Sequence, residues 1–349
     1  MRSLPIAGRG TPLNPASRFE TLEVDRDPWT TLDDPSPLTR FYRDGSRSVL
    51  VTNDSPDVGL DVGINPYRGC EHGCIYCFAR PNHEYLGFSA GLDFETRIVV
   101  KQDAPALLRD ALRRPSWRPR PIMLSGVTDP YQPAERRLRV TRGCLEVLAE
   151  ARNPVALITK NRAVTRDLDL LRELARHGAV AVTVSVTTLR RDLQRVMEPR
   201  TSTPLRRLDA IRALADAGVP VGVNLAPVIP GLTDEEIPGI LEAAREAGAT
   251  WSGYILLRLP HGVKDLFVDW LGTHFPDRRD RVLNRLREAY GGNLYDAAFG
   301  IRGKGTGEYA AQIKALFRGA ARKLGMERPP ELSTAAFRPP SPPGQLSLF

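Results

Sequence analysis

Three of the four cysteines in this chain lie close together, at Cys70, Cys74 and Cys77. A loop with this spacing can turn three sulfur atoms toward one point. Gly69 and Gly73 each precede one of these cysteines and can adopt the positive φ angles that such a wrap needs. Because thiolates are ligands of zinc and of iron-sulfur clusters, the loop predicts a metal centre.

Two kinds of metal centre fit three cysteines. Structural zinc takes four Cys or His ligands, and His72 or His83 could supply the fourth. Zinc-binding cysteines usually occur as two separated pairs, however, and this chain has no second pair. Three clustered cysteines are also a poor disulfide framework. An iron-sulfur cluster held by three thiolates would leave one iron open to a non-protein ligand, since four thiolates are normally needed to close it. The cluster is the favoured interpretation.

The loop resembles the cysteine motif of the radical S-adenosylmethionine superfamily, with Tyr76 as the aromatic residue before the last cysteine. The wider segment 65–80 resembles the branch that contains spore photoproduct lyase, and the resemblance extends over about residues 60–260. It implies that the three cysteines hold a 4Fe-4S cluster whose open iron binds S-adenosyl-L-methionine. It also implies cleavage of that cofactor to a 5′-deoxyadenosyl radical, with an electron donor such as flavodoxin or ferredoxin.

The elements that must position this loop follow from the apolar pattern. Strands that alternate with helices predict a parallel sheet. We expect an α/β fold, a partial (β/α)6 barrel, which is also the fold that the resemblance implies. Strands are expected at 61–64, 121–125, 155–159, 180–185, 219–224 and 253–257, and helices at 136–151, 162–176, 204–217 and 234–246.

Residues at the ends of these elements sharpen their boundaries. Gly178, Gly218 and Gly248 are expected to end helices, because glycine readily adopts the left-handed conformation. Thr233 is expected to cap the start of a helix. The expected domains are an irregular N-terminal extension at 1–58, the barrel at 59–260, a helical C-terminal extension at 261–326 with two helices near 278–290 and 308–324, and an extended Pro-rich tail at 327–349.

Ligands of parallel β/α barrels bind at the carboxyl ends of the strands, so the residues after each strand are site candidates. After the second strand come Ser125, Gly126, Thr128 and Asp129. The resemblance implies that this segment grips the amino group of S-adenosylmethionine. The alternative is a proline-containing turn in which Asp129 is a local cap.

Candidates for the rest of the nucleotide follow the later strands. Lys160 is expected beside the carboxylate or the ribose, and Ser185 at the ribose. Glu198 offers a carboxylate for hydroxyls and Arg200 a guanidinium for a carboxylate. Ile229 lies in a segment that resembles the adenine-packing segment of the superfamily. The alternatives are a solvated lysine, surface arginines and a buried strand end.

No hydrogen-donor cysteine is present in residues 121–126, where spore photoproduct lyases carry one. This absence argues against the same thymine-dimer repair, and Tyr131 or Tyr254 could replace that donor. Cys144 is expected to be a small buried hydrophobic residue. The glycine-rich turn at 303–307 lacks the spacing of a phosphate-binding loop and is expected to be a flexible basic turn near the substrate.

The net charge is +8, from 49 basic and 41 acidic side chains, and arginine greatly outnumbers lysine. A basic excess favours a polyanion partner, and we expect a nucleic acid, most plausibly DNA. The arginine bias has an alternative origin in genomic base composition. No apolar run approaches the length of a membrane span, so we expect no membrane association and a cytoplasmic location.

The last five residues, Gln345, Leu346, Ser347, Leu348 and Phe349, resemble the pentapeptide by which bacterial replication and repair proteins dock on the β sliding clamp. Leu348 and Phe349 would anchor in an apolar pocket, and Gln345 would bond at its rim. The Pro-rich segment before them is expected to hold the peptide away from the barrel. Packing of this end on its own domain is the alternative.

The leading hypothesis is a radical S-adenosylmethionine enzyme that acts on nucleic acid, in DNA repair or lesion processing. Two alternatives stay open. The same chemistry could modify RNA or a peptide, or the chain could be an iron-sulfur binding or sensing module without turnover. Cleavage of S-adenosylmethionine would distinguish the module from the enzymes.

Overall fold

The computed structural model describes residues 6–15, 18, 38–326 and 328–342. Its centre is one seven-stranded sheet with the order β10-β9-β8-β7-β6-β3-β2. Six of these strands are parallel and stand in chain order, which confirms the predicted partial (β/α)6 barrel as an open sheet. They are β3 (Val62–Ile64), β6 (Ile122–Leu124), β7 (Val155–Thr159), β8 (Val180–Ser185), β9 (Val221–Val228) and β10 (Trp251–Leu256).

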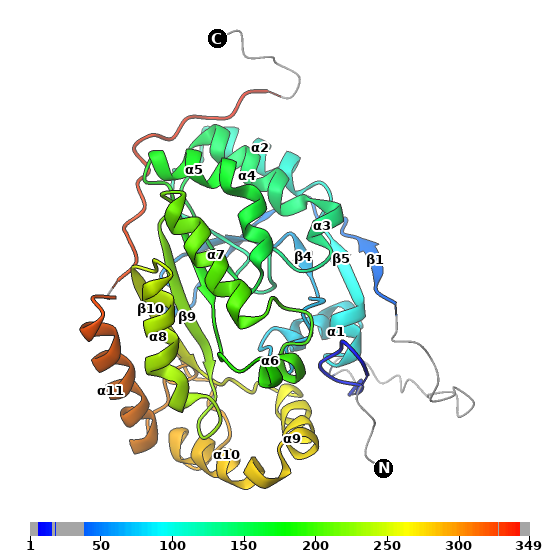
Figure 1. Cartoon of the computed structure of the whole chain (residues 1–349). Coiled ribbons are helices and arrows are strands. Elements are labelled where there is room, and N and C mark those ends of the chain that lie inside the picture. The colour runs from blue at the N-terminus through cyan, green and yellow to red at the C-terminus, as the bar shows by residue number, and fades with distance from the viewer. Residues whose placement is uncertain (1–5, 16–17, 19–37, 327, 343–349) are drawn as a thin grey trace.

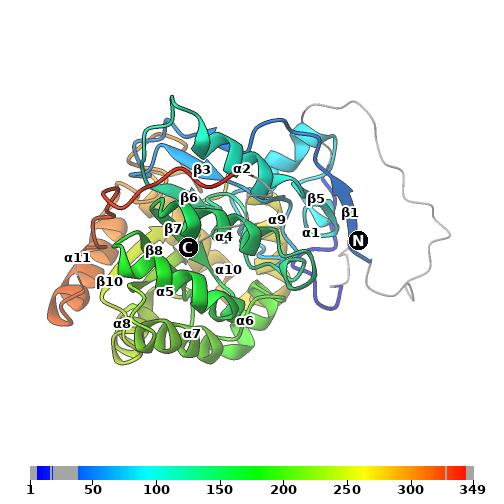
Figure 2. The same cartoon turned by 90° about the horizontal axis from the view of Figure 1, so that it is seen from above.

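Helices cover the outer face of this sheet (Figure 1, Figure 2). Alternate residues of β7, such as Val155 and Leu157, are fully buried beneath the helices, whereas Ala156 and Ile158 on the other face are half-buried. The face of β7 that carries Val155 and Leu157 is therefore the one that packs into the core. The covering helices are α2 (Ala104–Arg113), α4 (Val140–Ala151), α5 (Leu168–Arg176), α7 (Pro204–Asp216) and α8 (Ile237–Glu246).

The three glycines expected to end helices do so with positive φ, of 62° at Gly178, 72° at Gly218 and 104° at Gly248. Thr233 is the N-cap residue of the helical segment that begins at Asp234, as expected, but its hydroxyl accepts a hydrogen bond from the Ile229 backbone (2.9 Å) and does not cap that segment. Three expected helices are each divided. α3 (Glu135–Leu138) precedes α4, and the 3-10 helices η2 (Arg162–Asp167) and η3 (Asp234–Glu236) precede α5 and α8.

The N-terminal extension is more regular than expected. β2 (Leu50–Thr52) pairs antiparallel with β3, and β1 (Arg40–Arg43) joins a second, three-stranded sheet with β5 and β4. The pairing of β1 depends on backbone partners far along the chain, which a local pattern does not contain. The second sheet is completed by β4 (Tyr67–Arg68) and β5 (Arg97–Val100), beside η1 (Arg80–Leu86) and α1 (Leu92–Thr96).

The C-terminal extension contains three helices rather than the expected two: α9 (Val263–His274), α10 (Pro276–Ala289) and α11 (Glu308–Lys323). A further unexpected helix, α6 (Arg191–Met197), follows β8.

The tail from residue 328 to 342 is extended, as expected, but it runs along the outside of the molecule instead of standing away from it (Figure 1). The backbone of Arg338 donates to Ala151 (2.9 Å), and that of Ser341 donates to the Glu150 carboxylate (2.7 Å). The expectation that this segment is a free spacer is therefore wrong for the described part. The clamp-like pentapeptide 345–349 lies outside the described residues.

None of the helices in the described part of the chain combines the length and the apolar character that crossing a membrane requires.

Candidate active site

The cysteine loop lies between β4 and η1, where Cys70 and Cys74 are buried and Cys77 is half-buried. None of the three forms a disulfide. Gly69 and Gly73 have φ angles of 79° and 66°, as the wrap of the loop was expected to require. A side chain at Gly73 would also meet the Glu95 carboxylate at 2.8 Å. The loop is thus closely packed, with its thiols free.

A buried guanidinium anchors this loop. Arg80, fully buried, donates from Nε and Nη2 to the carbonyl oxygen of Cys74 (3.0 and 2.9 Å). Its Nη1 donates to the carbonyl oxygens of Ala90 (3.2 Å) and Gly91 (2.9 Å), and its Nη2 pairs with Glu95 at 2.6 Å. Sequence reasoning missed this pair, although an arginine three residues after the last cysteine was the available signal.

Residues 9–15, which we call the N-terminal strap, cross the outside of the cysteine loop. The Gly10 amide donates to the Glu95 carboxylate (3.0 Å), and the Arg9 guanidinium donates to the Glu95 carbonyl oxygen (3.1 Å). A Cβ atom at Gly10 would stand only 1.8 Å from the carbonyl oxygen of Gly73. The strap can lie this close to the loop only because position 10 is glycine.

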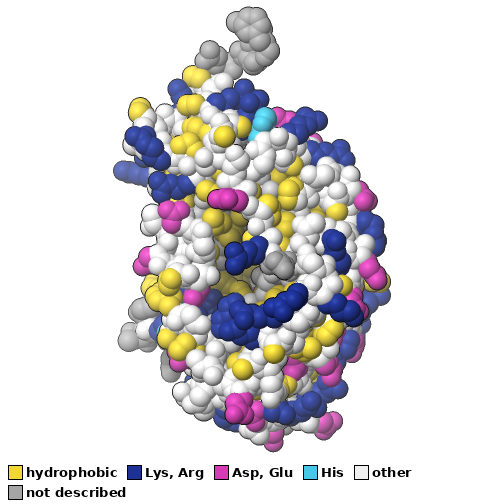
Figure 3. All heavy atoms as spheres, turned by 90° about the vertical axis from the view of Figure 1, so that its left-hand side faces the viewer, with side chains coloured by type: hydrophobic (Ala, Val, Ile, Leu, Met, Phe, Trp, Pro, Cys, Tyr) yellow, Lys and Arg dark blue, Asp and Glu magenta, His cyan; other side chains and the backbone are white. Residues whose placement is uncertain are grey.

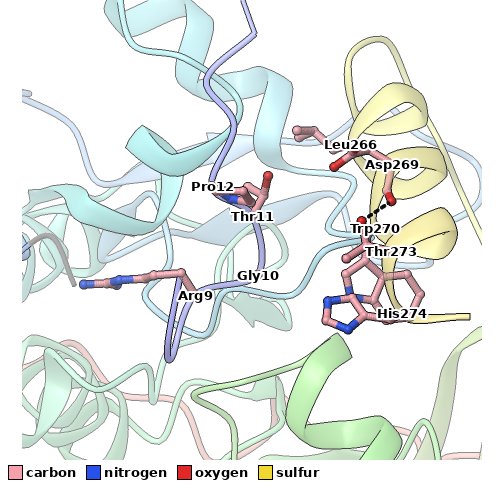
Figure 4. A pocket seen from close by; sticks show the side chains of 9 residues that line it. All are labelled: Arg9, Gly10, Thr11, Pro12, Leu266, Asp269, Trp270, Thr273 and His274. Carbon is pink, nitrogen blue, oxygen red and sulfur yellow. Dashed lines mark hydrogen bonds between the residues drawn. The ribbon is translucent and has the colours of Figure 1, made fainter. Parts of the chain in front are cut away.

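A pocket lies between the strap and α9 (Figure 4). Residues 9–12 line one side, and Trp270 and His274 are among the α9 residues on the other. None of the side chains that follow the barrel strands lines it. This pocket is therefore separate from the strand ends.

Asp129 is engaged by groups of the protein itself. Its carboxylate accepts from Thr159 Oγ1 (2.7 Å), from the backbone amides of Lys160 (2.7 Å) and Tyr131 (2.9 Å), and lies 3.4 Å from His72 Nδ1. Burial disfavours its charge, but His72 and these donors outweigh burial and lower the pKa of Asp129 to about 2. This arrangement favours the local-cap interpretation, in which Asp129 holds the cysteine loop to β7.

Glu198 is also paired internally. It is fully buried and accepts hydrogen bonds from the Tyr76 hydroxyl, from Thr187 Oγ1 (2.9 Å) and from the buried guanidinium of Arg207. Burial raises the pKa of Glu198, but the charges of Arg207 and Lys160 and the hydrogen bonds from Arg207 and Tyr76 together outweigh it, and the net direction is downward. Tyr76 and Glu198 therefore lie together, but as parts of one internal network that ties the cysteine loop to α7.

The turn after β6 links the barrel to β4. Ser125 has a positive φ of 63°, and its hydroxyl donates to the Thr128 carbonyl oxygen (2.5 Å). Thr128 in turn donates to the carbonyl oxygen of Tyr67, directly ahead of the cysteine loop (3.1 Å). Gly126 lies within the same turn and is exposed. These residues come together as expected, in a turn that positions the loop.

Less engaged polar residues stand in a row at the strand ends. Lys160 follows β7 and places its ammonium 5.9 Å from the centroid of the Tyr76 ring. Ser185 at the end of β8 is in register with Asn224 of β9, which is in register with Gly253 of β10. Sequence reasoning named Lys160 and Ser185 but missed Asn224, which lies within a strand rather than after it.

The remaining candidates lie apart from this row. Arg200 lies 3.2 Å from the Glu71 carboxylate, and its backbone amide donates to the His72 carbonyl oxygen, so it supports the cysteine loop from outside. Ile229 is fully buried at the end of β9, where its backbone is held by Thr233.

Both candidate hydrogen donors are buried. Tyr131 is fully buried, and its hydroxyl donates to Asp167 (3.0 Å). Tyr254 packs against Phe317 of α11 with ring centroids 4.6 Å apart, which places it on the outer face of β10. Cys144 is fully buried, as expected.

The possible metal ligands near the cysteine loop fit the two expected centres, zinc and an iron-sulfur cluster, unequally. Among the described residues, no three His, Cys, Asp or Glu side chains converge as the ligands of one metal ion would. His72 is held by Asp129 and Asn161, and His83 is buried between aromatic rings. Three free thiols on one closely packed loop fit the three-thiolate ligand set of a cluster.

Comparisons with known proteins agree with this geometry. The family model described as "Radical SAM superfamily" matches residues 64–244, more than half of the chain. An uncharacterized protein of Mycobacterium tuberculosis is 42% identical over 229 residues, which cover 65% of this chain and 66% of that protein, just under two thirds of its length. An uncharacterized protein of Methanocaldococcus jannaschii is 28% identical over 178 residues, covering 51% of this chain and 64% of that protein.

Solved structures show a similar fold. A complex of spore photoproduct lyase with dinucleoside spore photoproduct has a TM-score of 0.57 and 17% identity, and the match covers 82% of this chain and 81% of that one. The chain belongs to the Radical SAM superfamily. Members of this superfamily use a 4Fe-4S cluster and S-adenosylmethionine, so the expected family, fold and classes of cofactor are confirmed.

Proposed function

We propose that this chain is a radical S-adenosylmethionine enzyme in which Cys70, Cys74 and Cys77 hold the cluster. The observation that carries this proposal is the set of three free thiols on one packed loop, beside the carboxyl ends of parallel strands. When bound, the cluster supplies the electron that cleaves S-adenosylmethionine and releases a 5′-deoxyadenosyl radical. The protein must hold that radical close to its substrate and away from water.

The residues of the chain divide into two roles under this proposal. Arg80 and Glu95 fix the backbone of the cysteine loop, and Asp129 and the pair Glu198 and Arg207 join it to the barrel. Lys160 and Ser185 are the direct candidates for binding the nucleotide, because within the described residues the Lys160 ammonium and the Ser185 hydroxyl form no hydrogen bond or ion pair. The turn at 125–128 shapes the site beside them.

The proposed substrate is a nucleic acid, with DNA favoured. The net charge of +8 supports a polyanion, and one solved structure of similar fold is a lyase complexed with a dinucleoside photoproduct. We further propose a cytoplasmic location, a flavodoxin or ferredoxin as electron donor, and docking of residues 345–349 on a bacterial β sliding clamp.

Anaerobic reconstitution tests the proposed function. The wild-type protein should gain an iron-sulfur absorption band and convert S-adenosylmethionine to 5′-deoxyadenosine and methionine. Replacing any one of the three loop cysteines by Ala should abolish both, whereas Cys144→Ala, at a buried cysteine away from the loop, should retain the band. Zinc binding without an iron-dependent spectrum, or a cluster without any cleavage, would contradict the proposal. Incubation with deuterated DNA, RNA and peptide pools would then show which substrate transfers its label to 5′-deoxyadenosine.

A further inference from the structure

The barrel has an open edge, because its first and last parallel strands, β3 and β10, do not pair with each other. A loop between α10 and α11 spans part of this gap. The Leu256 amide of β10 donates to the Gly303 carbonyl oxygen (2.9 Å), and Arg302 pairs with Asp57 ahead of β3 (2.6 Å). The loop therefore joins the two sides of the opening.

Cationic side chains lie over aromatic rings along this opening. The guanidinium of Arg258 lies 4.4 Å from the centroid of the Phe78 ring, and that of Arg302 lies 4.5 Å from the Phe299 ring. The two rings remain 39% and 54% exposed. Together with Lys304, which is exposed, these residues form what we call the open-edge surface.

The open-edge surface begins at the cysteine loop. Phe78 directly follows Cys77, and Arg258 lies two residues beyond the carboxyl end of β10. The contact between Phe78 and Arg258 thus joins the proposed cluster loop to the last strand. Seen from the side of β10 and α11, the molecule is hollowed near its centre, and Lys and Arg side chains gather at the hollow (Figure 3).

The cations on this surface are unequally neutralised. Arg302 is paired with Asp57, whereas Arg258 and Lys304 form no ion pair with the described part of the chain. The Lys304 ammonium lies 5.2 Å from the centroid of the Tyr254 ring. The Nε atom of Arg258 is buried and has no hydrogen-bond partner there. Donors and positive charge are therefore left over beside two exposed aromatic faces.

Exposed aromatic rings next to unpaired cations are the chemistry by which proteins hold single strands, since bases stack on the rings and phosphates pair with the cations. We infer that the open-edge surface binds the nucleic-acid strand beside the nucleotide on which the enzyme acts. Phe299 and Phe78 stack bases, and Arg258 and Lys304 contact phosphates. This inference rests on the proposed function, because it takes the substrate to be a nucleic acid.

The test measures binding of a fluorescein-labelled single-stranded DNA oligonucleotide to the reconstituted full-length protein over a series of salt concentrations. The double variant Arg258→Ala with Lys304→Ala should bind at least tenfold more weakly. Its plot of log affinity against log salt should be shallower by about 1.4, since each phosphate contact on a single strand contributes about 0.7. Phe299→Ala should weaken binding by about tenfold with an unchanged slope, because stacking involves no counterion release.

The matched control is Arg176→Ala with Arg212→Ala, which removes two charges from exposed positions on α5 and α7. Its affinity and slope should stay close to those of the wild type. Equal losses in both double variants, or no loss in Arg258→Ala with Lys304→Ala, would overturn the inference.

A separate measurement keeps this outcome distinct from failure of the proposed function. Cleavage of S-adenosylmethionine by the wild-type protein reports on the radical chemistry alone. If the wild type cleaves it but binds acidic peptides in preference to DNA, the inferred nucleic-acid site is wrong while the radical chemistry stands. If the wild type does neither, the proposed function itself is wrong.

Discussion

The cysteine loop and the open-edge surface both depend on arginine but use it in opposite ways. Arg80 is fully buried and donates five hydrogen bonds, as many as a guanidinium has N–H donors. Arg258 is half-buried, lies over an exposed ring and leaves Nε without a partner. Only Ala79 separates Arg80 from Phe78, the ring beneath Arg258.

The two arginines differ in whether their hydrogen-bond donors are satisfied within the protein, and this difference separates a structural role from a binding role. A guanidinium whose donors are all satisfied internally fixes the backbone around it, and removing it takes hydrogen bonds from buried carbonyl groups and the ion-pair partner from a buried carboxylate. A guanidinium with unused donors contributes little to the fold and remains available to a ligand. The comparison predicts that the stability of the protein depends on Arg80 and that ligand binding depends on Arg258.

The largest effect is expected at Arg80. Arg80→Met should lower the free energy of unfolding by about 3–5 kcal/mol, because it leaves Glu95 charged and buried without its partner. Urea unfolding of the metal-free protein measures this change, and iron content after reconstitution should fall with it. The double variant Arg80→Met with Glu95→Met should lose less than the sum of the two single variants.

The control for Arg80 is Arg43→Met, which breaks an exposed pair with Asp103 and should change stability little. Equal unfolding curves for Arg80→Met and Arg43→Met would show that burial of the ion pair does not separate the two regions.

Gly10→Ala should displace the strap from the cysteine loop, because the added Cβ would stand 1.8 Å from the Gly73 carbonyl oxygen. We expect iron to be released to a chelator several-fold faster from the reconstituted variant. Gly45→Ala is the matched control, since nothing lies within 4 Å of a Cβ at that position. Identical release rates from the two variants would show that the strap does not shield the loop.

His83 should make the metal-free protein sensitive to acid. Burial lowers the pKa of His83 to about 4, and the charge of Asp93 partly offsets this effect. The unfolded state therefore binds a proton at this residue near pH 6.5, whereas the folded state binds it only near pH 4. The contribution of His83 to the free energy of unfolding is fully present above pH 6.5, and about 3 kcal/mol of it is lost as the pH falls toward 4. Urea unfolding across this range should show a weaker pH dependence for His83→Leu, and an unchanged dependence would refute the assignment.

The smallest effect is expected at Arg302 of the open-edge surface. Arg302→Ala removes a partly exposed pair with Asp57 and should lower the free energy of unfolding by less than about 1 kcal/mol. Thermal unfolding alongside Arg80→Met provides the direct comparison. A loss at Arg302 as large as that at Arg80 would mean that the loop at 298–304 is part of the core structure.

Local sequence was informative wherever a short pattern specifies backbone conformation. Val155 to Thr159 and the other apolar runs determined the six parallel strands, and Gly178, Gly218 and Gly248 marked the ends of helices. The short strands β1 and β4 were not predictable in this way, because each exists only through pairing with β5.

The spacing of Cys70, Cys74 and Cys77 by itself determined the type of site, since three thiolates so close together have few other uses. Only the tertiary structure decided which polar residues are free to act there. The sequence predicts Asp129 and Glu198 as nucleotide contacts, and the tertiary structure adds that their carboxylates lie beside His72 and Arg207. A local pattern does not contain such partners, because packing brings them together from distant segments and the cost of burying a charge selects them.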